Sequence, residues 1–86
     1  IKILNMNKIR LSNLELKTFT EQDTSDYCQL NSINHEDIIY LNLQYNELTD
    51  ISVIQNFKNL QELWCKNGFK NMSVTEQLYK NINIYE

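Results

Sequence analysis

The stretch IIYLNLQYNELTDISVI, residues 38–54, places Leu41, Leu43 and Leu48 at uneven gaps of two and five residues around Asn46. A helix repeats every 3.6 residues and a strand every two, so neither alone gives this spacing. Leu41 and Leu43 are two apart, which points both to one face of a short strand. A turn after the strand returns Leu48 to the same interior. One such coil cannot close a core by itself, whereas stacked coils can.

The pattern returns 22 residues later, from Leu60 to Gly68, with apolar residues at three matching positions. The segments that follow the two copies, 50–60 and 71–82, share Ser-Val, an aromatic residue and Lys-Asn. A fixed period of this length is typical of solenoid proteins.

A shift of 27 residues towards the N-terminus gives Leu11-x-x-Leu14-x-Leu16-x-x-Phe19, with Phe19 at the position of the asparagine. The sequence thus predicts a single domain over 1–86 with about three repeats. Their bounds are 11–37, 38–59 and 60–81, and Ile82-x-Ile84 opens a further copy. The remaining segment, Ile1 to Arg10, is interpreted as an earlier turn or an N-terminal cap.

The pattern Leu-x-x-Leu-x-Leu-x-x-Asn-x-Leu resembles the leucine-rich repeat family. The period of 22 and the continuation into Ile54 resemble its short-repeat subclass, which includes internalin-like surface proteins of bacteria and intracellular phosphatase regulators. The resemblance implies an α/β solenoid with parallel strands on the concave face and short helices on the convex face. The internalin-like group implies a bacterial surface, and the phosphatase-regulator group implies the inside of a eukaryotic cell.

The return segments carry helix start signals. Ser52-x-x-Gln55 and Ser73-x-x-Glu76 match capping boxes and predict short helices that end near Lys58 and Lys80. Thr20-x-x-Asp23 is a looser match before a longer helix, whose apolar residues at helical spacing are Tyr27, Leu30 and Ile33. Asn46 suits the turn after the strand, and Asn67-Gly68 predicts a tight turn.

The residues between the leucines should point outwards on the concave face, and Trp and Tyr are enriched where such faces bind partners. The predicted binding residues are Tyr40, Asn42, Gln44, Tyr45, Glu62, Trp64 and Lys66. In the first repeat the matching residues are Asn13, Glu15, Lys17 and Thr18. Two acidic and two basic residues then make the face nearly neutral, which implies no strongly charged partner.

We therefore expect a protein–protein interaction module that binds a protein or peptide and needs no cofactor. The alternative is a structural spacer or end repeat inside a larger protein or assembly. An enzyme is disfavoured: the cluster His35 to Asp37 reads as a solvated loop, and Cys28 with His35 lacks a third residue to orient the base. A single glycine excludes a phosphate loop.

The formal net charge is −3, with no cluster of Lys and Arg, so the sequence does not predict nucleic-acid binding. Apolar runs are far too short to span a membrane. The two cysteines have neither a disulfide framework nor zinc spacing and favour a reducing, cytoplasmic setting weakly. A chain that begins at Ile1 indicates a processed form, a fragment or the ordered part of something longer.

Overall fold

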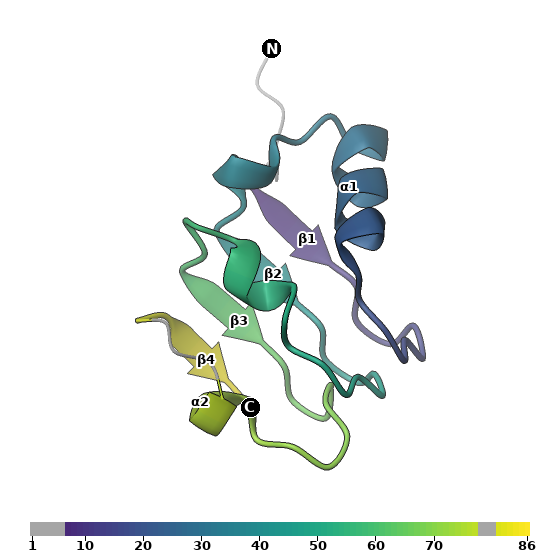
Figure 1. The fold of residues 1–86 in the computed structure, drawn as a ribbon, viewed down its shortest axis with the longest axis vertical. Coiled ribbons are helices and arrows are strands. Elements are labelled where there is room, and N and C mark those ends of the chain that lie inside the picture. The colour runs from purple at the N-terminus through teal and green to yellow at the C-terminus, as the bar shows by residue number, and fades with distance from the viewer. Residues whose placement is uncertain (1–6, 78–80) are drawn as a thin grey trace.

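The computed structural model describes residues 7–77 and 81–86. In this part of the chain, four short strands form one parallel sheet in the order β1-β2-β3-β4 (Figure 1). A helical segment follows each of the first three strands, which makes the fold an α/β solenoid, as the sequence predicts. The elements in chain order are β1 (Lys8–Arg10), α1 (Glu21–Leu30), η1 (His35–Asp37), β2 (Tyr40–Asn42), η2 (Ile54–Asn56), β3 (Glu62–Trp64), α2 (Val74–Gln77) and β4 (Asn83–Tyr85).

The strand register confirms the 22-residue repeat and corrects the first coil. Leu41 pairs with Leu63, and Leu63 pairs with Ile84, so Ile84 does open a fourth strand. Leu41 pairs on its other side with Ile9, whereas the sequence pattern had aligned it with Leu14. The first coil is therefore 32 residues long, because it contains the ten-residue helix α1. The division into repeats at 11, 38 and 60 stays a prediction.

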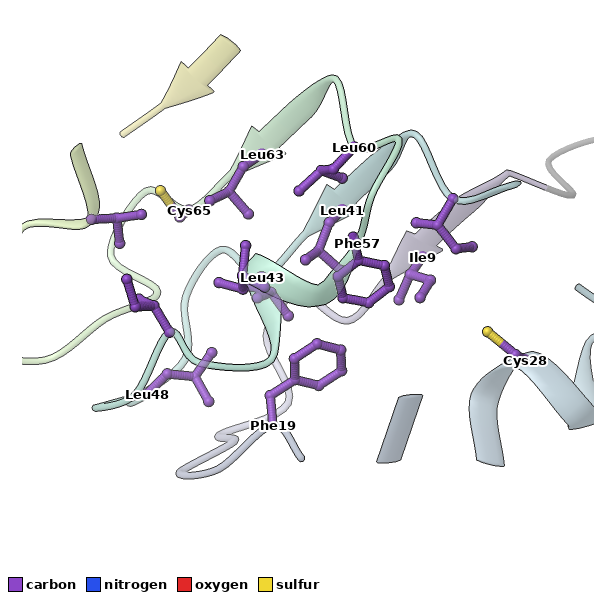
Figure 2. Close-up of a cluster of buried hydrophobic side chains, with 14 residues drawn as sticks. Ile9, Phe19, Cys28, Leu41, Leu43, Leu48, Phe57, Leu60, Leu63 and Cys65 are labelled. Carbon is purple, nitrogen blue, oxygen red and sulfur yellow. The ribbon is translucent and has the colours of Figure 1, made fainter. Parts of the chain in front are cut away.

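The core lies between the sheet and the return segments. The middle residue of each of the first three strands, Ile9, Leu41 and Leu63, has no solvent exposure. Phe57, directly after η2, is equally buried and stacks on Phe19 with ring centroids 6.4 Å apart, as Figure 2 shows. Phe19 thus fills the core and does not take the place of the turn asparagine. Each such side chain contributes about 1.5–3 kcal/mol by leaving water.

Helix α1 begins with the capping box that the sequence predicted. The Thr20 hydroxyl accepts from the Asp23 amide at 3.1 Å, and the Asp23 carboxylate accepts from the Thr20 amide at 2.9 Å. The predicted apolar face is wrong in part, because Leu30 is 85% exposed. The buried residues of α1 are Thr24 and Cys28. Because these two residues are small or polar, a periodicity of large apolar side chains does not identify the buried face of α1.

The second predicted capping box does not form. The Ser52 hydroxyl donates to Asp50 Oδ1 at 2.6 Å, and η2 has no side-chain cap. This hydrogen bond lowers the pKa of the Asp50 carboxyl. Helix α2 starts directly after Ser73, as the third predicted capping box indicates, and its predicted end at Lys80 lies outside the described residues.

Asn46 occupies the predicted turn and also bonds to the neighbouring coil. Its Oδ1 accepts from the amides of Leu14 and Leu16 at 3.1 and 3.0 Å. Its Nδ2 donates to the Leu11 carbonyl at 2.9 Å and to the Leu43 carbonyl at 3.0 Å. The side chain, 8% exposed, therefore joins the first two coils.

The predicted Asn67-Gly68 turn is present, closed by a 2.8 Å bond from the Gly68 amide to the Cys65 carbonyl. A Cβ on Gly68 would lie 2.2 Å from the Leu43 carbonyl oxygen. Glycine stands at the asparagine position of this coil because the backbone of the preceding coil leaves no room for a side chain. The inter-coil hydrogen bonds of Asn46 therefore have no equivalent at Gly68.

Candidate functional site

The candidate site is the side of the sheet that faces away from the core. Each of the first three strands buries its middle residue, and the middle residue of β4, Ile84, is half-buried; the first and third residues of every strand point outwards. We call these outward residues the strand face. It consists of Lys8, Arg10, Tyr40, Asn42, Glu62, Trp64, Asn83 and Tyr85.

The strand face contains four of the seven predicted binding residues. Tyr40 lies beside Glu62, and Asn42 lies beside Trp64, as the 22-residue period predicts. The first coil differs, because Lys8 and Arg10 occupy the places that the sequence pattern had assigned to Asn13 and Glu15. The corrected register follows directly from the pairing of Ile9 with Leu41.

Three aromatic rings form a continuous stack across β2, β3 and β4. Trp64 and Tyr85 lie nearly parallel, at 17° with centroids 4.2 Å apart. Tyr40 packs on the other side of Trp64 at 6.4 Å with a 36° tilt. Offset pairs of this kind contribute about 0.5–1.5 kcal/mol beyond their buried area. Tyr85 was missed from the sequence, although its position next to Ile84 in the fourth copy could have revealed it.

The indole of Trp64 carries a buried polar atom without a partner. Nε1 is buried and has no hydrogen-bond acceptor among the described residues. A buried donor without a partner costs about 1–3 kcal/mol, so within the described residues this N–H group offsets part of what the ring stacking contributes. Such an exception is a reason to look for a functional role at this residue.

Two cations lie at the β1 end of the aromatic stack. Lys8 Nζ is 5.3 Å and Arg10 Cζ is 5.5 Å from the centre of the Tyr40 ring. Both distances are within the range of a cation–π interaction. Within residues 7–77 and 81–86, neither side chain forms an ion pair; Lys58 and Glu36 do form one, away from the strand face. The prediction of a nearly neutral face is therefore wrong, because it rested on the incorrect first coil.

Tyr45 follows the strand face at the turn after β2. It is 44% exposed and has a φ of 57°, in the left-handed region. Asn13 and Asn67, at the same place in the coils before and after, share this conformation with φ of 61° and 54°. Asparagine adopts it more readily than tyrosine, so Tyr45 is held in a strained backbone conformation. Strain of this kind clusters at functional sites.

The other two predicted binding residues are less informative. The amide of Gln44 donates to Asn42 Oδ1 at 3.0 Å, which fixes the local chain. Lys66 is exposed after β3 and makes no recorded side-chain contact with the described residues.

Cys28 and His35, the pair that the sequence disfavoured as catalytic residues, line the same cavity. This cavity has a volume of about 570 Å³ and lies between α1 and η2. His35 stacks on Phe57 with centroids 4.6 Å apart, so the predicted solvated loop is a short 3₁₀ helix with a packed imidazole. Burial raises the pKa of the Cys28 thiol, and a protonated thiol is a poor nucleophile.

The second cysteine, Cys65, is also buried and free. Burial, followed by the nearby Glu86 carboxylate, raises the pKa of its thiol to about 12. In the described residues, no group of three His, Cys, Asp or Glu side chains is arranged to hold a metal ion. The same part of the chain contains no helix long and apolar enough to cross a membrane.

Stacked coils that each give one strand to a parallel sheet define the class of an α/β solenoid. A family model described as leucine-rich repeats, in two copies, matches residues 38–78. These residues are thus similar to leucine-rich repeats, which generally mediate protein–protein interaction and are typically not enzymes. Comparisons with curated proteins and with solved structures gave no match.

Proposed function

We propose that this chain is a recognition module that binds a protein or peptide on its strand face, which the sequence predicts to be concave. The observation that carries the proposal is the stack of Tyr40, Trp64 and Tyr85 on the side of the sheet away from the core. Large aromatic side chains are the residues that most often dominate binding energy at interfaces.

Two further features support this choice. The Trp64 Nε1, which has no acceptor among the described residues, and the left-handed backbone of Tyr45 each carry a free-energy cost. Two such costs on one surface are expected where function, and not folding, selects the residues. Tyr45 lies beyond the stack and extends the predicted contact area towards the turn.

The alternative is a structural spacer or end repeat, in which neighbouring material covers the sheet permanently. The outer edge of β4 favours it, because β4 pairs with β3 and with no second strand among the described residues. Open strand edges readily pair with further strands. A spacer of this kind should self-associate through the edge of β4, while mutations of the strand face leave its assembly unchanged.

A pull-down from lysate of the source cell separates the two functions. The bait is the wild-type chain, beside a Tyr40→Ala, Tyr45→Ala, Trp64→Ala variant shown to be folded by circular dichroism. A matched control, Leu30→Ala, removes an apolar side chain that is 85% exposed on α1. The proposal expects a protein that the wild type and the control retain and the triple variant loses. Equal retention by all three chains contradicts it.

A further inference from the structure

The charge of the strand face differs from the charge of the whole chain. The chain has 8 basic and 11 acidic side chains. On the strand face the order is reversed, with Lys8 and Arg10 against Glu62 alone, and Lys66 lies two residues after the end of β3. Glu86 follows directly after β4 and keeps its negative charge when it accepts a hydrogen bond from the Thr75 hydroxyl, but it lies at the opposite edge of the sheet from Lys8 and Arg10.

Lys8 and Arg10 are held in place by the Tyr40 ring, and neither forms an ion pair with a described residue. Both lie against the Tyr40 ring, which holds their charges at one end of the aromatic stack. A cation–π contact orients a cation but leaves its full charge available to an anion. Unpaired positive charges beside an apolar surface favour a partner with complementary negative charge, which also speeds its approach.

The distances set the spacing of that partner's side chains. Neighbouring strands lie about 4.8 Å apart, so roughly 9.6 Å separate β1 from β3 across the sheet. An extended peptide rises about 3.3 Å per residue, so three residues span this gap. Carboxylates over Lys8 and Arg10 would therefore be about three residues away, in either chain direction, from an apolar side chain over Trp64.

We propose that the strand face binds an acidic peptide segment in which Asp or Glu lies about three positions from an aromatic or large aliphatic residue. The carboxylates pair with Lys8 and Arg10, and the apolar residue packs on Trp64 and Tyr85. This inference rests on the proposed function and adds the chemistry of the partner.

The test uses three pools of synthetic peptides with one fixed Phe and otherwise random small polar residues. The acidic pool carries two Asp residues about three positions from the Phe, on its N-terminal side in half of the peptides and on its C-terminal side in the others. The amide pool has Asn at these positions, and the basic pool has Lys. Retention of each pool on the immobilised full chain is measured at about 20 mM and about 0.5 M salt, because screening weakens exposed charge pairs.

The expected result is at least about tenfold greater retention of the acidic pool than of the amide pool at low salt, with little preference at high salt. Lys8→Gln with Arg10→Gln should abolish the preference. Lys58→Gln with Lys70→Gln, which changes net charge equally but lies outside the strand face, should keep it.

Three results overturn the inference: no retention of the acidic pool, equal retention of the acidic and amide pools, or an acidic preference that survives Lys8→Gln with Arg10→Gln. Equal retention that is lost with Trp64→Ala would leave the proposed function standing and remove only the charge requirement. A failure of the proposed function is seen separately, in the pull-down of the preceding section.

Discussion

Replacing Asn46 by alanine should destabilise the chain strongly, because this side chain joins two coils. The substitution removes acceptors from the amides of Leu14 and Leu16 and a donor from the carbonyl of Leu11. Each hydrogen bond contributes about 1 kcal/mol net, and a buried group left unpaired costs more. Leu14 is 53% exposed, so water can pair its amide and reduce the loss. We expect a total of about 3 kcal/mol.

The assay is urea unfolding followed by circular dichroism, with the slope of the transition checked for each variant. The matched control is Asn34→Ala, which removes one exposed cap bond to the Glu36 amide and should cost about 1 kcal/mol or less. If Asn46→Ala costs no more than Asn34→Ala, the Asn46 side chain does not join the first two coils in the way these hydrogen bonds indicate.

Three further predictions concern single residues. Gly68→Ala should cost about 1–3 kcal/mol in urea unfolding, because its Cβ would meet the Leu43 carbonyl oxygen; an unchanged midpoint refutes the close contact. Tyr45→Asn should stabilise the chain by about 1 kcal/mol by relieving left-handed strain, while weakening partner retention; no gain in stability would contradict the strain. Stability should fall as pH rises above about 9, and Cys65→Ala should reduce this fall by about 1 kcal/mol at pH 10; equal pH profiles would refute it.

The sign of the pH effect follows from the thiol. Burial raises the pKa of Cys65 to about 12 in the folded chain, so the unfolded chain releases its proton first as pH rises. The contribution to stability is complete below the unfolded pKa and is lost progressively between the two values. Comparison with Cys65→Ala at each pH isolates this group from tyrosine ionisation.

The sequence predicted the parts of the fold that depend on short spacing. Leu41 and Leu63 repeat at a fixed period and pair in the sheet, and Asn46 occupies the turn. The first coil could not be phased this way, because Ile9-x-Leu11 and Leu14-x-Leu16 both present apolar residues two apart. Only the length of α1 decides between them, since it extends the coil to 32 residues.

The incorrect alignment of the first coil also affected the predicted binding residues. Tyr40 and Trp64 were found because they lie in the two coils with regular spacing. Lys8 and Arg10 were missed because they lie in the coil whose register was wrong, and with them the positive charge of the face. No sequence rule gives the stacking of Tyr85 on Trp64, since that contact depends on the rotamers of residues 21 positions apart.

The central claim is that the strand face, and Trp64 within it, contacts the partner. The chain has one tryptophan, so its indole gives a single side-chain cross-peak in a ¹H–¹⁵N NMR spectrum. Titration of the labelled chain with the captured partner is the most direct measurement. The account predicts that this peak shifts together with the amides of β2, β3 and β4, while the amides of α1 stay in place. A shift confined to α1 and η2, with the indole peak unmoved, would contradict it.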